Sequence, residues 1–139
     1  LYPGEPSVAA TLLLNHVVLE PGQAVRLDAG NLHAYLRGAG VELMGASDNV
    51  VRAGLTTKPV DVDELLRVAD LSSLADPVLP RSDRYDLPAA GVALQRLPAG
   101  VEHVAVGHEL AIDLVGDAWY LAPGDHFITA AETYVAVPI

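Results

Sequence analysis

Apolar and β-branched residues fall in short runs along the first part of the chain, and each run stops at a turn sequence. The turns are rich in Gly, Pro, Asn and Asp, which end strands and favour tight reversals of the chain. This pattern predicts four short strands, at residues 11–19, 24–27, 32–37 and 41–46.

One helix is expected after these strands. Residues 61–69 (DVDELLRVA) place apolar residues at spacings of three, four and seven, which is the spacing of one helical face. Asp61 is expected to cap the helix, with Glu64 three residues later as in a capping box. Residues 70–89 then carry several prolines among Ser and Asp. They predict a surface linker between two β-units.

The strand pattern resumes beyond this linker. Residues 109–115 (ELAIDLV) alternate, which predicts a strand with its Leu and Ile facing a core and with Glu109 and Asp113 facing solvent. Residues 121–124 (LAPG) resemble residues 19–22 (LEPG), and each precedes a short predicted strand, which indicates a weak internal repeat. Short strands punctuated by Gly and Pro predict an all-β fold, a sandwich or a barrel, with one short helix between two β-units.

The composition is that of a globular protein. Of 139 residues, 51% are hydrophobic and 19% are charged, which excludes a disordered tail. The absence of Cys excludes a disulfide framework, thiolate catalysis and thiolate zinc sites. No apolar run is long enough to span a bilayer, and no signal-peptide pattern opens the sequence. A cytoplasmic protein is therefore expected.

The net charge is −10 and it is unevenly distributed. From residue 101 onward there are acidic residues but no Lys or Arg. Nucleic acid and anionic membranes are therefore poor partners, because both require clustered positive charge. A phosphorylated small molecule would have to use the basic residues of the first sixty, which are Arg26, Arg37, Arg52 and Lys58.

The first candidate for chemistry is His33. On the inner face of a small barrel this imidazole can reach a metal, or a backbone carbonyl can satisfy it. The stretch Gly22-x5-Asp28-x-Gly30-x2-His33 resembles the cupin motif G-x5-P-x-G-x2-H-x3-N, with Asp28 at the proline and Arg37 at the asparagine. In the cupins this histidine is a metal ligand, and the resemblance implies jelly-roll β-barrels.

A longer resemblance covers residues 31–58 (NLHAYLRGAGVELMGASDNVVRAGLTTK). From His33 onward this run resembles the signature of type I mannose-6-phosphate isomerases, approximately H-A-Y-L-x-G-x-x-x-E-x-M-A-x-S-D-N-x-x-R-x-G-L-T-P-K. Gly45 and Thr57 depart from it, and neither change removes a titratable group. Residues 12–30 and 60–66 also read like this family, so the resemblance covers about the first half of the chain.

The resemblance implies a zinc enzyme that interconverts mannose 6-phosphate and fructose 6-phosphate by proton transfer through a cis-enediol. It implies His33 as a zinc ligand, Arg52 and Glu42 as catalytic residues, and Tyr35, Asp48 and Lys58 as substrate-binding residues. The residue chemistry agrees with these roles. An aldose–ketose shift needs a group that moves a proton and a cation that holds the enediolate oxygens, and a phosphate needs charge-assisted donors.

Each of these residues also has an ordinary structural interpretation. Glu42 could be an exposed residue of an amphipathic strand, and Asp48 could cap backbone amides in a turn. Arg52 and Lys58 could be solvated charges. Tyr35 could belong to the core, with its hydroxyl satisfied nearby.

The other zinc ligands of this family come from an earlier part of the polypeptide, as a Gln-x-His pair and a glutamate. No Gln-x-His occurs here, since Gln23 and Gln95 are followed by other residues. One imidazole does not make a zinc site, which needs three or four protein ligands. His103 and His108 are expected to be surface residues around a turn. Zinc is therefore expected to be absent or weakly bound in this chain.

We interpret the chain as a C-terminal portion of such an isomerase, inactive when isolated. Residues 1–60 would be part of the catalytic cupin, 61–89 a helix and linker, and 90–139 a C-terminal cupin-like β-domain. Its expected partners are a phosphorylated hexose, the N-terminal part of the same enzyme and a second copy paired through a free sheet edge. The alternative function is a non-catalytic cupin-type sugar-binding or interaction module.

Overall fold

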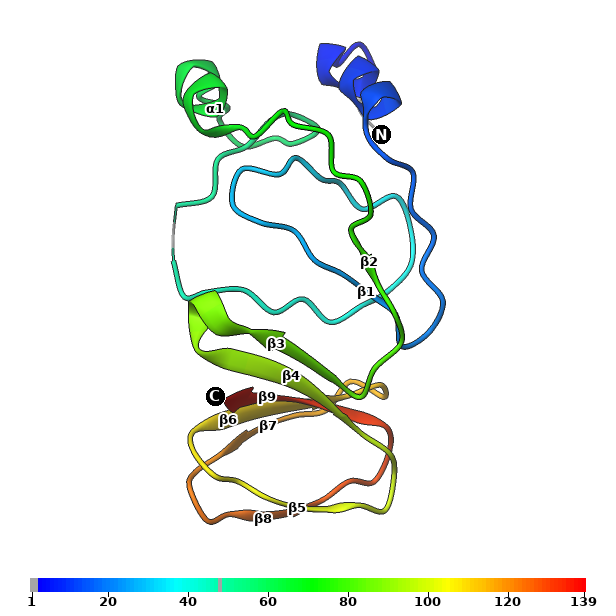
Figure 1. Ribbon diagram of the computed structural model, residues 1–139, viewed down its shortest axis with the longest axis vertical. Coiled ribbons are helices and arrows are strands. Elements are labelled where there is room, and N and C mark those ends of the chain that lie inside the picture. Colours follow the sequence, from blue (N-terminus) through cyan, green and yellow to red (C-terminus); the bar gives the residue numbers. More distant parts are fainter. Residues whose placement is uncertain (1–2, 48) are drawn as a thin grey trace. The chain divides into compact units, whose positions relative to one another are not determined.

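A computed structural model describes residues 3–47 and 49–139 and shows a mostly β protein with one α-helix, as the sequence predicts (Figure 1). No closed barrel forms among these residues. The elements are η1 (Pro6–Leu13), β1 (Ala24–Val25), α1 (Val62–Val68), β2 (Val78–Leu79), β3 (Arg84–Leu87), η2 (Pro88–Ala90), β4 (Val92–Leu97), β5 (Glu102–Val104), β6 (Glu109–Asp113), β7 (Ala118–Leu121), β8 (His126–Ile128) and β9 (Thr133–Pro138).

The chain divides into two compact units. The first unit comprises Leu1–Gly38 and Ser47–Arg81, and the second comprises Ala39–Ala46 and Ser82–Ile139. The main division therefore falls within the segment predicted as a linker, residues 70–89. That segment is not bare linker, because it carries β2, β3 and η2.

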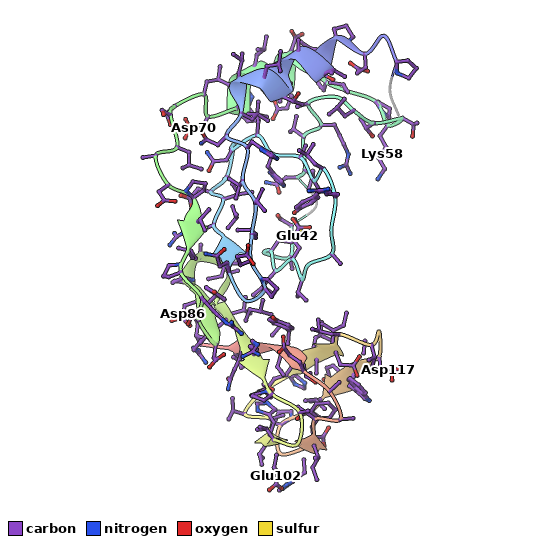
Figure 2. The ribbon with its side chains drawn as sticks, turned by 90° about the vertical axis from the view of Figure 1, so that its right-hand side faces the viewer. Glu42, Lys58, Asp70, Asp86, Glu102 and Asp117 are labelled. Atoms are coloured by element: carbon purple, nitrogen blue, oxygen red, sulfur yellow. The ribbon has the colours of Figure 1, made fainter. Side chains whose placement is uncertain are left out.

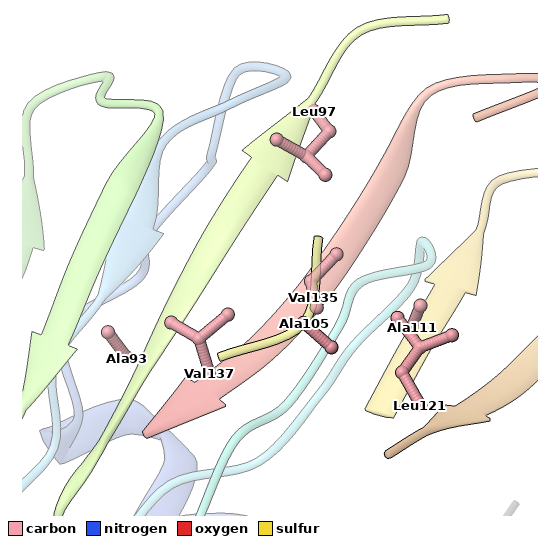
Figure 3. Close-up of a cluster of buried hydrophobic side chains, with 7 residues drawn as sticks. All are labelled: Ala93, Leu97, Ala105, Ala111, Leu121, Val135 and Val137. Atoms are coloured by element: carbon pink, nitrogen blue, oxygen red, sulfur yellow. The ribbon is translucent and has the colours of Figure 1, made fainter. Parts of the chain in front are cut away.

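The second unit is built on a five-stranded antiparallel sheet of order β3-β4-β9-β6-β7 and on a separate two-stranded antiparallel sheet of β5 and β8. One face of the larger sheet carries the hydrophobic core, formed by Ala93, Leu97, Ala105, Ala111, Leu121, Val135 and Val137 (Figure 3). Trp119 and Phe127 pack against this cluster, with their rings 4.9 Å apart. Most of the core side chains are Ala and Val, so the two aromatic rings add much of the apolar surface packed around them.

Strand β6 contradicts the predicted direction of residues 109–115. Glu109, Ala111 and Asp113 are buried, whereas Leu110 and Ile112 are exposed. The buried carboxylates are satisfied locally: Asp113 accepts hydrogen bonds from the backbone N–H groups of residues 115, 116 and 117 at 2.8 to 3.0 Å. A carboxylate with several backbone donors can be buried, so simple alternation assigns the wrong face here.

The likeness of residues 19–22 and 121–124 corresponds to a repeated turn, not to two similar β-units. In residues 20–23 the N–H of Gln23 donates to the carbonyl of Glu20, and in residues 122–125 the N–H of Asp125 donates to the carbonyl of Ala122. Pro and a left-handed Gly occupy the two central positions of each turn, which is the type II pattern. In each turn the last side chain also accepts from the first N–H, at 2.8 Å.

The first unit has less strand structure than the sequence predicts. Of the expected strand at 24–27, Ala24–Val25 forms β1, which pairs with β2. Residues 11–19 and 32–37 form no strand, and residues 6–13 form a 3-10 helix instead. Residues 41–46, also predicted as a strand, have no strand assignment and belong to the second unit. These apolar runs lack a neighbouring strand to complete a ladder, and a strand alone is not stable.

The predicted helix is confirmed. α1 begins after Asp61, whose carboxylate accepts a hydrogen bond from the N–H of Glu64 at 2.9 Å. The side chain of Glu64 binds Arg67 through two hydrogen bonds of 2.6 and 2.8 Å rather than only supporting the cap. These bonds lower the pKa of Glu64 and raise that of Arg67.

The first unit has no buried residue in its described part. Large apolar side chains stand in solvent, such as Leu12 at 85%, Leu13 at 88% and Leu71 at 76% exposure. A few long-range contacts hold its loops together, including the backbone hydrogen bond from Asp70 to Gly30 at 3.0 Å. The two units therefore differ in the most basic requirement of a stable fold, a set of side chains removed from water.

Candidate functional site

His33 follows a turn at residues 28–31 and is exposed. Its Nδ1 lies 3.2 Å from the carbonyl oxygen of Asn31, and its ring meets that of Tyr35 edge to face at 5.7 Å. When Nδ1 carries the proton it donates to that carbonyl, and Nε2 keeps its lone pair. A backbone carbonyl that orients one ring nitrogen in this way is the usual support of a metal-ligating histidine. His33, the predicted metal ligand, and Tyr35, a predicted substrate-binding residue, lie next to each other in the structure.

Arg52 and Lys58 lie on the loop that leads toward α1, where Arg52 is half-buried and Lys58 is exposed. Within residues 3–47 and 49–139 neither cation has a carboxylate within ion-pair distance. By contrast, Arg26 pairs with Asp28 and Arg67 pairs with Glu64. Cationic side chains that are not ion-paired can bind a phosphate or an enediolate oxygen more readily than Arg26 and Arg67, whose charges are already paired. Asp48, the predicted substrate-binding carboxylate, lies outside the described residues.

The backbone of this loop is specialised. Gly54 has φ of +134° and Leu55 has φ of +52°, both in the region that L-residues rarely adopt. A side chain at position 54 would collide with that of Ser7, whose hydroxyl donates to Glu5 at 3.0 Å. In the sequence, Gly54 is one position of the motif with no assigned role. The structure shows why glycine is needed: a larger residue would collide with Ser7, so the path of the loop between Arg52 and Lys58 depends on this glycine.

Glu42 belongs to the second unit and is exposed. It lines a groove of about 530 Å³ over the outer face of the five-stranded sheet. Among the described residues that line this groove, Glu42 is the one with a charged side chain. Tyr120 and Tyr134 supply hydroxyls to the same groove, while Leu94 and Leu110 make its floor apolar. The structure thus groups Glu42 with the second unit.

The chain's described residues contain no cluster of three or more His, Asp or Glu side chains able to hold a metal. His33 stands as a single potential ligand.

The prediction that His103 is a surface residue is wrong. Its side chain is 12% exposed, and Nε2 lies 2.5 Å from a carboxylate oxygen of Glu109, which is fully buried. The other oxygen of Glu109 accepts from the N–H of Val106 at 2.9 Å. The pair is satisfied and internal, so we assign it to the fold. His108 is exposed as predicted, and its ring stacks on that of Tyr120.

A further charged cluster escaped sequence analysis. Arg96 on β4 bridges Asp83 at 2.8 Å and Glu132 at 2.5 Å, and these two carboxylates raise its pKa. Burial and the neighbouring charge of Glu132 raise the pKa of the Tyr134 hydroxyl. The sequence spacing of these residues does not predict the cluster, because they are far apart in the chain and strand pairing brings them together. An arginine already shared by two carboxylates is a poor phosphate ligand, so the cluster is structural.

In the part of the chain that the structure describes, no helix is long and apolar enough to cross a membrane. No family model matches the chain, and no solved structure matches it.

Curated relatives do match. The chain is 56% identical over 64 residues to "Probable mannose-6-phosphate isomerase" of Dictyostelium discoideum, which is 46% of this chain and 14% of that protein. It is 44% identical over 90 residues to "Mannose-6-phosphate isomerase" of Rattus norvegicus, covering 60% of the chain and 21% of the relative. For the Escherichia coli (strain K12) protein of the same name the identity is 51% over 65 residues, 47% of the chain and 17% of the relative.

These matches confirm the resemblance: roughly half of the chain is related in sequence to mannose-6-phosphate isomerases. The chain spans only 14% to 21% of the length of these curated relatives.

Proposed function

We propose that this chain is a C-terminal portion of a cytoplasmic mannose-6-phosphate isomerase, an enzyme that interconverts mannose 6-phosphate and fructose 6-phosphate through a cis-enediol. The observation that carries the proposal is the identity of 44% to 56% with proteins named as this isomerase. A second support is chemical. The segment of resemblance retains an imidazole, a carboxylate and two cations that form no ion pair with a carboxylate of residues 3–47 or 49–139.

Arg52 and Lys58 are the proposed anion-binding residues. A sugar phosphate carries its phosphate group and, during the reaction, a developing enediolate oxygen. Both are negative and both are stabilised by fixed cationic donors. Arg52, the half-buried one, is proposed at the enediolate, because a partly desolvated guanidinium interacts more strongly with developing charge than a solvated one. Lys58 is proposed at the phosphate.

Glu42 is the proposed proton carrier between C1 and C2. A carboxylate can take the proton from one carbon and return it to the other, so no net proton is consumed. Tyr35 and Asp48 are proposed to orient sugar hydroxyls as hydrogen-bonding partners.

His33 would be the one zinc ligand that this chain supplies. The described residues do not complete a zinc site, because no second or third ligand stands beside this imidazole. We therefore propose that the N-terminal part of the same enzyme provides the remaining ligands. The isolated chain is expected to be inactive.

A chimera tests this proposal. Residues 12–66 of this chain would replace the corresponding segment of the Escherichia coli enzyme, and isomerase activity and zinc content would be measured. We expect an active, zinc-containing chimera. His33→Ala should lose both zinc and activity, whereas Arg52→Ala should retain zinc and lose activity by about a hundredfold or more.

Matched substitutions provide the controls. His16→Ala and Arg37→Ala remove the same side-chain types from exposed positions outside the proposed site, and both should leave the chimera active. If Arg52→Ala is as active as Arg37→Ala, the assignment of the catalytic cation is wrong.

The second candidate function, a non-catalytic sugar-binding or interaction module, is favoured by the absence of a three-ligand cluster among the described residues. It predicts a different chimera, one that folds and takes up zinc from the host enzyme's ligands but has no isomerase activity. Such a result would support the module and contradict the isomerase.

A further inference from the structure

The five-stranded sheet has two outer strands, β3 and β7, and their free edges differ. Figure 2 labels Asp86 on β3 and Asp117 in the turn before β7, at opposite sides of this sheet. A free edge exposes backbone N–H and C=O groups that can pair with another strand, unless side chains occupy them. The chemistry of each edge therefore decides whether it can accept a partner.

The register of β6 and β7 shows which backbone groups of β7 point outward. The N–H of Asp113 donates to the carbonyl of Asp117 at 3.0 Å, so residue 117 bonds toward β6. Because the direction alternates along an antiparallel strand, Ala118 and Tyr120 direct their N–H and C=O groups away from β6. In the described part of the chain no backbone hydrogen bond outside the ladders engages either residue. Beyond them the edge ends, since the N–H of Ala122 is taken by the carboxylate of Asp125.

The edge of β3 is closed by the same reasoning. The N–H of Arg96 donates to the carbonyl of Asp83, so Arg84 and Asp86 are the outward residues. The hydroxyl of Ser82 donates to the carbonyl of Arg84 at 2.8 Å and accepts from its N–H at 3.1 Å. The side chains of Arg84 and Asp86 form an ion pair along this edge. A charged edge on which the N–H and C=O of Arg84 are already bonded resists strand addition.

We propose that a second copy of this chain pairs with the open edge of β7. The two β7 strands would run antiparallel about a two-fold axis through Trp119, so that Ala118 of each copy faces Tyr120 of the other. In this register both residues donate and accept a backbone hydrogen bond across the interface, and no outward group between them is left unpaired. The two sheets become one continuous sheet.

Side-chain chemistry favours a second copy as the occupant. Residues 118–121 (AWYL) carry no charge, so the strand meets itself without repulsion. Each exposed Tyr120 ring lies opposite a small Ala118, a large-to-small match on one face of the sheet. The two Asp117 side chains would stand about 14 Å apart along the strands. That is beyond the screening length of about 8 Å at physiological ionic strength.

Analytical ultracentrifugation of the 139-residue chain, from micromolar to near-millimolar concentration, tests this inference. We expect a reversible monomer–dimer equilibrium that strengthens with added salt, because two chains of net charge −10 repel at long range. Ala118→Pro removes an outward N–H without breaking the ladder to β6. It should weaken the dimer by about tenfold or more, since each copy loses a hydrogen bond.

Two comparisons make the result specific. Asp86→Pro removes the corresponding outward N–H from the β3 edge and should leave the dimer unchanged. Ala118→Asp keeps the backbone donor but places charge at the seam, and it too should weaken the dimer. The fluorescence of Trp119 reports whether each variant is folded. A chain that is monomeric throughout overturns the inference, and so does self-association that survives both Ala118 substitutions. The inference is independent of the proposed function.

Discussion

The two units of this chain differ in sequence resemblance and in burial. The first unit carries most of the residues that resemble the isomerases, yet its described part buries no side chain. The second unit has the hydrophobic core and the five-stranded sheet. A functional motif and a folding core are therefore separate properties here.

The physical basis of this difference is the number of strand partners. In the second unit every strand of the larger sheet has at least one long neighbour, and the inner face is covered by the β5–β8 pair and Trp119. Among the described residues of the first unit, the pairing of strands is limited to β1 with β2, two residues each. Apolar runs without partners remain in water, where they contribute nothing to stability.

The largest effect is expected from Glu109→Ala. Removing this buried carboxylate leaves His103 and the N–H of Val106 without their partner, which should destabilise the second unit by about 3 kcal/mol or more. Denaturant unfolding followed by the fluorescence of Trp119, the single tryptophan, measures it. Glu102→Ala, at the exposed ion pair with His126, is the matched control and should have little effect.

A pair of identical substitutions compares the units directly. Val135 is completely buried, so Val135→Ala should cost about 2–3 kcal/mol by loss of packing and a residual cavity. Val18 is 70% exposed, so Val18→Ala should be almost neutral. Thermal unfolding of the two variants gives both values under the same conditions. Equal destabilisation would mean that the first unit has a core of its own.

A smaller effect is expected at alkaline pH. The pKa of Tyr134 is raised above its ordinary value of 10.0 by burial and by the charge of Glu132. Because the folded state holds the hydroxyl neutral, its contribution to stability is complete below the unfolded pKa and is lost as the pH rises through the folded pKa. Spectrophotometric titration should show a late-titrating tyrosine that Tyr134→Phe removes and Tyr35→Phe leaves in place.

The sequence predicted the fold class and the locally determined elements of the structure well. The helix after Asp61 and the paired Pro-Gly turns depend on contacts within a few residues, which a sequence pattern contains. The strands at 11–19 and 32–37 failed because a strand depends on a neighbour that the pattern cannot supply.

Burial was predicted less well, for a related reason. Glu109 and Asp113 are buried because His103 and a tight turn satisfy their carboxylates, and hydrogen-bonding partners of this kind leave no periodic signal in the sequence. The same holds for Arg96, which finds Glu132 across strand β9. In the site, His33 lies beside Tyr35 although the strand predicted for residues 32–37 does not form. The need for glycine at position 54 became visible only through its contact with Ser7.

Hydrogen exchange across the whole chain tests the contrast between the units most directly. The account predicts amides protected about a thousandfold or more in β4, β6 and β9, the strands that carry the core. It predicts amides that exchange almost freely in residues 3–20 and 49–60, where nothing is buried. Protection of the first unit to the same degree as β9 would contradict it.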